Sequence, residues 1–255
     1  MYATERHREI VALLRERDRV SVAGLAQKFG VTTETIRRDL EMLDERGLVQ
    51  RVHGGAVPRV PDFVAESGLM ERQGLNPALK QAIAERALAY LPPASGSILL
   101  DSGTSTGTLA LLLPEGDAPT IITNSVAIAA LMSSRDVTEV LLLGGRVRGL
   151  TQSVVGTQAL EALGRLRVDV TFLGANGFSL EHGFSTPDAA EAAVKRAMIR
   201  AARQVVALVD SSKLGTESLH SFARLADVDV LITDSRLPEE ARAKLSETGL
   251  EVVLA

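Results

Sequence analysis

The segment from residue 31 to residue 43, VTTETIRRDLEML, constrains this chain most, because it predicts a short turn followed by an amphipathic helix. Ile36, Leu40 and Leu43 recur at the spacing that places side chains on one buried helix face. Hydroxyl and guanidinium groups lie largely on the other faces, from Thr33, Thr35, Arg37 and Arg38. Such a helix can enter a DNA major groove, where Arg pairs with guanine and Thr reaches a base edge or a phosphate. A solvated helix surface explains these residues equally well when they are taken alone.

The flanking segments favour the DNA-binding interpretation. Residues 21–29 predict a short capped helix, and Gly30 is suited to end it in a left-handed conformation. Thr32 or Thr33 can then cap the next helix through a hydroxyl. Two helices joined by a glycine-containing turn form a helix-turn-helix, and a further helix is expected over residues 4–17.

A hairpin is predicted after the long helix. Residues 48–52 and 56–59 form its two short strands, and the glycines between them supply a tight reversal. The basic side chains of this wing that can touch the DNA backbone or the minor groove are Arg51, His53 and Arg59.

The run from residue 31 to residue 51, with His53-Gly54-Gly55-Ala56 after it, closely resembles the DNA-binding signature of the DeoR/GlpR family of bacterial repressors. A Thr-Ile-Arg-Arg-Asp-Leu core and an Arg-x-His-Gly-Gly-Ala wing are both present without gaps. The resemblance implies a winged helix-turn-helix domain, residues 1–57, that binds double-stranded operator DNA. The residues expected at the DNA are Thr32, Thr33, Thr35, Arg37, Arg38, Arg51, His53 and Gly54.

Composition places the chain among globular proteins, with 45% apolar and 24% charged residues over 255 positions, enough for one or two domains. No apolar run approaches membrane-spanning length and no signal-peptide pattern is present, so we expect a cytoplasmic protein with no membrane partner. The lack of cysteine excludes disulfides and thiol catalysis, and the four histidines have no metal-ligand spacing. We therefore expect no metal and no cofactor.

The net charge of −4 argues weakly against DNA binding if the chain is treated as one object. Residues 1–59 alone carry 11 Lys and Arg against 9 Asp and Glu, a net charge of +2, whereas the remainder carries −6. The placement of individual arginines must therefore matter more than bulk charge.

An α/β domain is predicted after a linker at residues 58–75. Asn76-Pro77 opens a helix, and from residue 97 short apolar runs alternate with helical stretches, which favours a Rossmann-like domain with a mainly parallel sheet over residues 76–255. The expected strands are 98–100, 120–123, 140–143, 168–173, 205–209 and 230–233, with 251–254 at an edge. The expected helices between them are 106–113, 125–133, 158–166, 188–203 and 239–248.

Ligands of such sheets sit at the carboxyl ends of the strands. Five of the six main runs end in small polar or charged residues, at 101–107, 123–125, 144–148, 174–177 and 210–213. One such loop could be an ordinary helix cap, but five at one edge predict a site. Hydroxyls, free backbone amides and Lys213 suit a phosphate, whereas Asp101, Asn124 and Asn176 suit sugar hydroxyls. From spacing alone, Lys195 is better explained as a solvated helix lysine.

This region also resembles the sensor domain of the DeoR family, which binds phosphorylated sugars or polyols and whose fold is similar to that of ribose-5-phosphate isomerases. The matching pieces include the strand-end loops and the pair Glu191 and Lys195. The residues expected at the effector are Asp101, Ser102, Gly103, Thr104, Ser105, Thr106, Thr123, Asn124, Gly144, Gly145, Asn176, Lys195 and Lys213.

A sugar-phosphate isomerase-like enzyme with an appended DNA-binding domain is the alternative. Those isomerases carry an Asp-Gly-Ala-Asp run, and the run that matches it here, Leu173-Gly174-Ala175-Asn176, lacks both acids, so it offers no general base. A purely structural DNA-binding protein would leave the polar strand ends unexplained.

The sequence thus predicts a non-enzymatic, ligand-responsive repressor of a sugar-metabolism operon, whose effector lowers operator affinity. Paired winged modules read paired half-sites, so we expect a homo-oligomer, a dimer or a tetramer. The sensor loops resemble those of repressors of fructose or related sugar operons, and glycerol 3-phosphate and deoxyribose phosphate remain alternatives.

Overall fold

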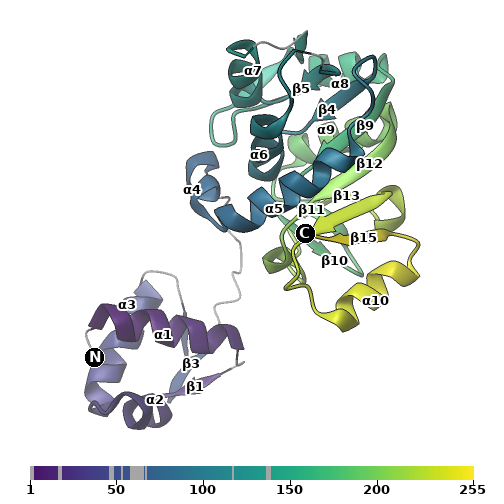
Figure 1. The fold of residues 1–255 in the computed structure, drawn as a ribbon. Helices are drawn as coiled ribbons and strands as arrows, with labels where there is room; N and C mark the ends of the chain where they lie inside the picture. Colours follow the sequence, from purple (N-terminus) through teal and green to yellow (C-terminus); the bar gives the residue numbers. More distant parts are fainter. Residues whose placement is uncertain are drawn as a thin grey trace. The chain divides into compact units, whose positions relative to one another are not determined.

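The computed structural model describes residues 3–16, 19–45, 49–52, 54–57, 66, 68–116, 118–135 and 139–255. Contacts within the chain divide it into two compact units, Met1–Val64 and Ala65–Ala255 (Figure 1). No helix in the described ranges is long and apolar enough to cross a membrane.

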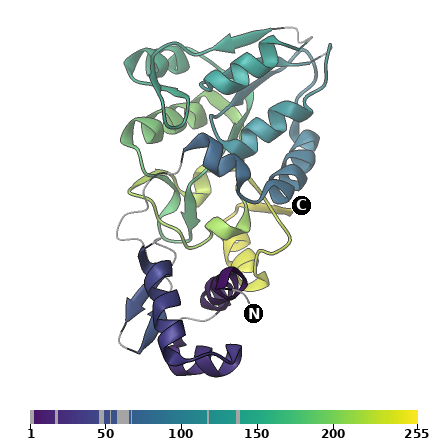
Figure 2. The same ribbon diagram turned by 90° about the vertical axis from the view of Figure 1, so that its left-hand side faces the viewer.

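The N-terminal unit is a winged helix-turn-helix, as predicted. Its elements are α1 (Ala3–Glu16), β1 (Val20–Ser21), α2 (Val22–Phe29), α3 (Thr33–Glu45), β2 (Gln50–Val52) and β3 (Gly55–Val57). The strands form an antiparallel sheet in the order β1-β3-β2. Ile10, Leu25, Ile36 and Leu40 belong to the buried cluster around which the three helices gather (Figures 1 and 2).

Local chemistry sets the turns of this unit. Gly30 ends α2 in the left-handed region, at φ 63°, and the Thr32 hydroxyl caps α3 by accepting from the Thr35 amide at 3.2 Å. In the wing, Gly54 has φ 79°. A Cβ on Gly55 would lie 2.0 Å from the Val20 carbonyl oxygen, so only glycine lets β3 pair with β1 there.

The C-terminal unit is built on a seven-stranded sheet in the order β15-β14-β12-β9-β4-β5-β6, and every pair of neighbours is parallel. Its strands are β4 (Ser97–Leu100), β5 (Thr120–Thr123), β6 (Val140–Leu142), β9 (Val168–Leu173), β12 (Ala202–Leu208), β14 (Val230–Thr233) and β15 (Glu251–Leu254). Its helices are α4 (Leu69–Gly74), α5 (Pro77–Ala87), α6 (Thr104–Leu112), α7 (Val126–Ser133), α8 (Thr157–Gly164), α9 (Ala189–Ala201) and α10 (Glu239–Glu247), with short 3₁₀ turns at Leu88–Tyr90, Ser211–Lys213 and Leu225–Asp227.

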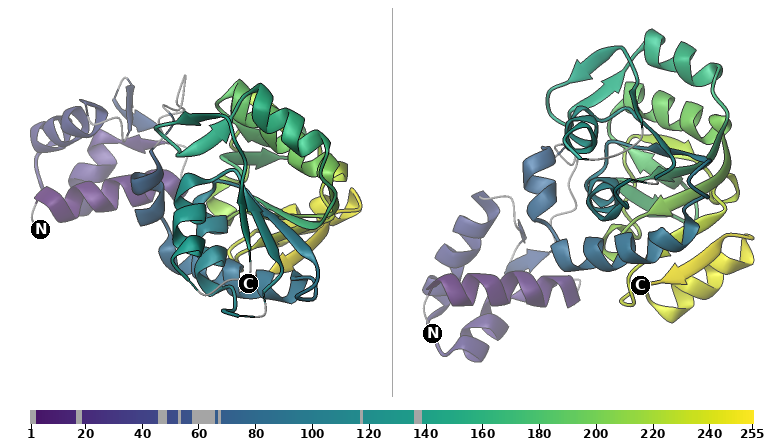
Figure 3. Two further views of the ribbon diagram at one scale, coloured as in Figure 1. Left: turned by 90° about the horizontal axis from the view of Figure 1, so that it is seen from above. Right: turned by 45° about the horizontal axis from the view of Figure 1, so that its top comes forward.

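Helices cover both faces of this sheet (Figure 3). Ile98 and Leu100 point to the face covered by α5, α6 and α7, whereas Leu99 points to the face covered by α8 and α9. The alternation of buried side chains along β4 therefore produces two cores, and the predicted Rossmann-like fold class is confirmed.

The strand order creates a switch point. The chain runs outward from β4 through β5 to β6 and then returns to place β9 on the other side of β4. The loops after β4 and β9 thus leave the sheet in opposite directions, which opens the crevice where doubly wound folds bind ligands.

Several elements were not predicted. A hairpin, β7 (Arg146–Arg148) with β8 (Ser153–Val155), and an antiparallel sheet of β10 (Gly177–Ser179), β11 (Gly183–Thr186) and β13 (His220–Ala223) add to the main sheet. Helix α4 lies inside the segment 58–75 that we expected to be a linker, and the Asn76 side chain does not cap α5. The predicted boundaries 1–57, 58–75 and 76–255 stay predictions.

Candidate functional site

Helix α3 presents basic side chains on the face opposite its buried residues. Ile36, Leu40 and Leu43 are almost completely buried, whereas Arg37 and Arg38 are exposed. The Arg37 side chain is 59% exposed and has one weak ion pair, at 3.4 Å to Glu34 on the same helix. Both guanidiniums are therefore available to an external partner.

The wing continues this surface. Arg51 on β2 is exposed and pairs with Glu41 at 3.2 Å. Arg37, Arg51 and Gly54 line one concavity of about 300 Å³ between α3 and the wing. Thr33 is exposed, while Thr32 and Thr35 join their hydroxyls at 2.9 Å. His53, also predicted at the DNA, lies outside the described residues.

Asp39, in the middle of the signature, has a structural role that the sequence did not reveal. It is buried and accepts from Arg6 Nε at 2.5 Å and from Arg6 Nη2 at 3.0 Å, and it contacts His7 Nε2 at 2.8 Å. Burial alone would raise the pKa of the Asp39 carboxyl, but the bonds with Arg6 and His7 outweigh it and lower that pKa. Asp39 therefore fixes α1 onto α3.

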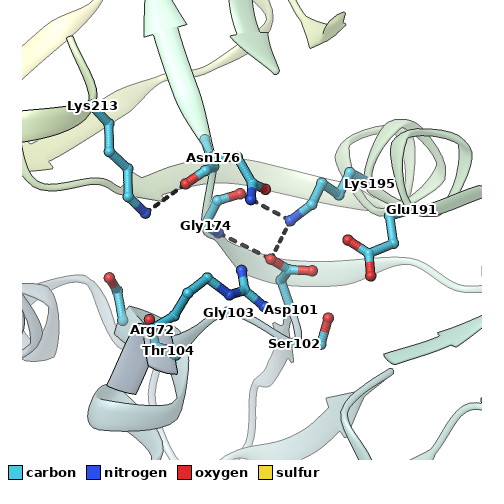
Figure 4. Close-up of a pocket in the computed structure, with 12 residues that line it drawn as sticks. Arg72, Asp101, Ser102, Gly103, Thr104, Gly174, Asn176, Glu191, Lys195 and Lys213 are labelled. Carbon is cyan, nitrogen blue, oxygen red and sulfur yellow. Dashed lines mark hydrogen bonds and ion pairs between the residues drawn. The ribbon is translucent and has the colours of Figure 1, made fainter. Parts of the chain in front are cut away.

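A pocket lies at the switch point of the large sheet (Figure 4). It is formed by the loops that follow β4, β9 and β12, together with one face of α9 and one residue of α4. Its lining residues are Arg72, Asp101, Ser102, Gly103, Thr104, Ser105, Gly174, Ala175, Asn176, Glu191, Lys195 and Lys213. Eight of the thirteen residues predicted at the effector are thus brought together.

Asp101 and Lys195 form a buried ion pair at the centre of the pocket. Asp101 Oδ2 also accepts from the Gly174 amide at 3.1 Å, and Lys195 Nζ donates to the Gly174 carbonyl at 2.9 Å. The interpretation of Lys195 as a solvated helix lysine is wrong, since the residue is only 5% exposed. The second carboxylate oxygen of Asp101 is buried and has no hydrogen-bond partner in the described structure, so it remains an acceptor for a ligand.

Lys213 and Glu191 flank this pair. Lys213 Nζ donates to the Ala175 carbonyl at 2.7 Å, and burial lowers the pKa of Lys213 to about 8, with repulsion from Arg72 adding to the effect. Burial would raise the pKa of Glu191, but Lys195 and neighbouring hydrogen-bond donors outweigh it and keep that pKa low. The pocket thus holds a charged acid on one side of this pair and, on the other, a lysine whose charge depends on pH (Figure 4).

Five residues predicted at the effector lie outside this pocket: Thr106, Thr123, Asn124, Gly144 and Gly145. Thr106 donates its hydroxyl to the carbonyls of Asp101 and Gly103, at 2.6 and 2.8 Å, and therefore shapes the loop from behind.

The end of β5 is covered by the β7–β8 hairpin. The Thr123 hydroxyl donates to the Leu100 carbonyl at 2.8 Å. Asn124 is buried, and its main-chain carbonyl accepts from the Val154 amide at 2.7 Å. Gly144 and Gly145 are exposed where that hairpin begins.

A larger cavity adjoins the pocket. The pocket itself has room of about 10 Å³, which suits one water. The adjoining cavity measures about 540 Å³ and shares Ser102, Gly103 and Thr104 with the pocket. Its other walls come from α4, α5, α6 and α7. A small ligand of sugar size therefore has space directly beside the strand-end loops.

A winged helix-turn-helix unit together with an α/β unit that has a pocket at its switch point defines a DNA-binding regulator with a sensor domain. A family model described as a DeoR-like helix-turn-helix domain matches residues 6–59, and one described as a DeoR C-terminal sensor domain matches residues 75–235. The chain belongs to the DeoR family of transcriptional regulators, as its sequence predicted.

Named relatives fit this assignment. The chain is 38% identical to the HTH-type transcriptional regulator GlpR of Haloferax volcanii, over 99% of this chain and 98% of the relative. It is 28% identical to the glycerol-3-phosphate regulon repressor of Escherichia coli K12, over the full length of both. A ribose-5-phosphate isomerase in complex with phospho-erythronic acid aligns over 54% of each chain, at 18% identity and a TM-score of 0.38, which is too low to carry an argument.

Proposed function

We propose that this regulator represses a sugar-metabolism operon in the cytoplasm, and that a phosphorylated sugar or polyol at the switch-point pocket lowers its affinity for the operator. The observation that carries the proposal is the buried oxygen of Asp101 that has no hydrogen-bond partner among the described residues and lies beside Lys195 and the start of α6. A ligand hydroxyl can satisfy this oxygen, and the adjacent cations can bind a phosphate on the same molecule.

The phosphate would sit between Lys213 and the start of α6. Gly103 is the N-cap of α6 and has no side chain that could accept a hydrogen bond from the first helical amides. The amides of Thr104 and Ser105 can therefore donate to an anion. Asp101 would repel a phosphate, and we therefore assign Asp101 to a hydroxyl. One of the named relatives is a glycerol-3-phosphate regulon repressor, which supports this ligand class without fixing the sugar.

DNA binding and oligomerisation complete the proposal. The exposed basic surface of Arg37, Arg38 and Arg51 would contact the operator. One winged module touches few phosphates, so we propose a homodimer or homotetramer that reads paired half-sites.

The test is a thermal-shift screen with fructose 1-phosphate, fructose 6-phosphate, glycerol 3-phosphate and deoxyribose 5-phosphate, followed by titration of operator-bound protein with the best ligand. We expect release of DNA by the wild type and no release by Gly103→Val, because a Cβ there already lies 3.2 Å from the Thr106 hydroxyl and 3.5 Å from Gly174 Cα. Lys213→Ala should require more ligand. If both variants respond like the wild type, the effector binds elsewhere.

Isomerase activity is the alternative function to test. Asp101 and Lys195 form a buried acid–base pair, but Leu173 and Asn176 stand where the resembling isomerases carry acids. We propose that the protein has no turnover with ribose 5-phosphate. Turnover by the wild type that is lost in Lys195→Ala would reverse this assignment.

A further inference from the structure

Arg72 reaches the pocket from an element outside the sheet and its crossover helices. It belongs to the six-residue helix α4, and its side chain extends toward the loops that carry Asp101 and Gly174 (Figure 4). Its Nε is shielded from solvent and has no hydrogen-bond partner among the residues that the structure describes. A shielded, unpaired guanidinium nitrogen is costly, so this position calls for an acceptor.

The neighbouring acids accept no hydrogen bond from Arg72 within the part of the chain that the structure describes. Asp101 uses Oδ2 for Lys195 and the Gly174 amide, and its Oδ1 makes no hydrogen bond with the guanidinium. Glu191 is engaged by Arg148, Thr151 and Ser153. Asp210 accepts from Asn76 at 3.3 Å and from Ser212.

Two further cations lie near Arg72: Lys213 lines the same pocket, and Lys80 lines the adjoining cavity. Lys80 and Lys213 both repel Arg72, and each donates its ammonium to backbone carbonyls and not to a carboxylate. Asp210 is the acid that acts on both lysines, and its single negative charge does not balance the three cations. The α4 side therefore keeps an excess of positive charge that would stabilise an anion from outside.

We propose that Arg72 binds the anionic group of the effector, together with Lys213 and the first amides of α6. This inference rests on the proposed function and deepens it, because it names the residue that distinguishes a phosphorylated ligand from its neutral parent sugar. The guanidinium offers two parallel N–H donors to a phosphate, which a lysine at this position would not reproduce.

The position of Arg72 also gives the effector a route to regulation. Helix α4 begins four residues after the boundary at Ala65, so it is the first helix that the chain forms in the sensor unit. It is held there by the Leu69 amide, which donates to the Leu150 carbonyl at 3.0 Å, and by Lys80, which donates to the Arg72 carbonyl at 2.8 Å. An anion bridging Arg72 and Lys213 adds a direct connection between α4 and the strand ends.

Inorganic phosphate is the probe that tests this inference without knowledge of the sugar. Full-length wild type, Arg72→Ala and Arg72→Lys are titrated with phosphate at pH 7, at an ionic strength kept constant with chloride, and binding is followed by thermal shift and calorimetry. Arg86→Ala is the matched control, because Arg86 lies exposed on α5 away from the pocket. The unliganded melting temperature of each variant reports whether the substitution itself disturbs the fold.

We expect Arg72→Ala to bind phosphate about tenfold to a hundredfold more weakly than the wild type, as for the loss of a charge-assisted hydrogen bond. Arg72→Lys should recover part of this loss, and Arg86→Ala should match the wild type. If Arg72→Ala binds phosphate like the wild type while Lys213→Ala does not, the inference on Arg72 is wrong and the proposed site stands. If neither phosphate nor any phosphorylated sugar of the screen binds the wild type, the proposed function fails and the inference fails with it.

Discussion

The guanidinium of Arg148 hydrogen bonds both carboxylate oxygens of Glu66, at 2.7 Å through Nη2 and at 3.1 Å through Nη1. The two side chains are only 14% and 10% exposed. Arg148 also contacts Glu191 at 2.5 Å and Asp188 at 3.2 Å, so one arginine at the end of β7 serves three acids. The chain just before α4 is thereby fastened to α9, the helix that carries Lys195.

Loss of Arg148 should destabilise the sensor unit. Arg148→Met leaves Glu66 without its cation and takes from Glu191 one of its two neighbouring cations, since Lys195 remains. We expect a loss of about 3–5 kcal/mol in the free energy of unfolding. Urea denaturation followed by circular dichroism measures it. Arg203→Ala is the control, because its ion pair with Asp169 is 3.9 Å long and largely exposed, and it should change stability by less than about 1 kcal/mol. If the two variants lost equal amounts of stability, the buried network of Arg148 would contribute no more than an exposed ion pair.

Asp39 gives a prediction for the N-terminal unit. Asp39→Asn removes the charge that pairs with Arg6, and we expect a loss of about 3 kcal/mol of stability in that unit, with weaker operator binding as a consequence. The folded pKa of Asp39 is lowered, so its contribution is present above the unfolded pKa of about 4 and disappears as the pH falls through the folded pKa. The difference between wild type and variant, measured by thermal unfolding, should therefore shrink on acidification below pH 4. A difference that stays constant down to pH 2 would contradict the assigned ion pair.

The recognition surface is tested by two single substitutions. Arg37→Ala and Arg38→Ala should each weaken operator binding by about 1–3 kcal/mol, because both side chains are exposed on α3. Fluorescence anisotropy with the upstream region of the protein's own operon measures the affinity. Lys244→Ala, on the surface of α10, removes the same charge elsewhere and should leave the affinity unchanged. Wild-type affinity in both arginine variants would remove α3 from the DNA interface.

Lys213 should make phosphate binding depend on pH. Its folded pKa of about 8 lies below its unfolded value, so its ammonium loses its charge as the pH rises through 8. A phosphate ester stays doubly charged above pH 7, and if only the protonated lysine binds it, affinity should fall by about tenfold between pH 7 and pH 9. Calorimetry at the two pH values measures this ratio. Lys213→Arg keeps its charge throughout and should show little change, and a wild type as insensitive as this variant would exclude Lys213 from the site.

The fold followed from patterns that burial imposes. The mainly apolar runs at residues 98–100 and 168–173 predicted β4 and β9, because strands covered on both faces carry mostly apolar side chains. Asp101 and Lys213 each follow a strand of this sheet. Because parallel strands end at one edge of a sheet, the sequence predicted both residues at one site.

The differences between the predictions and the structure have physical causes as well. Asn124 also follows a strand, but β8 covers that strand end, and neither strand of the β7–β8 hairpin is long enough to leave a clear pattern. Arg72 lies in a segment without periodicity, so no sequence signal connected it with Asp101. Lys195 looked like a surface residue because the acid that holds it is 94 positions away in the chain.

The switch-point pocket is already filled by its own ion pair, with space for no more than a water molecule. An effector that enters it from the adjoining cavity must first separate Asp101 from Lys195, and the free energy of this opening is subtracted from the binding affinity. If the effector binds as proposed, the contacts between Asp101, Lys195 and Gly174 raise the threshold concentration of effector that induces the operon. A substitution that loosens them without touching the ligand would lower that threshold, so sensitivity to the metabolite can evolve separately from the choice of metabolite.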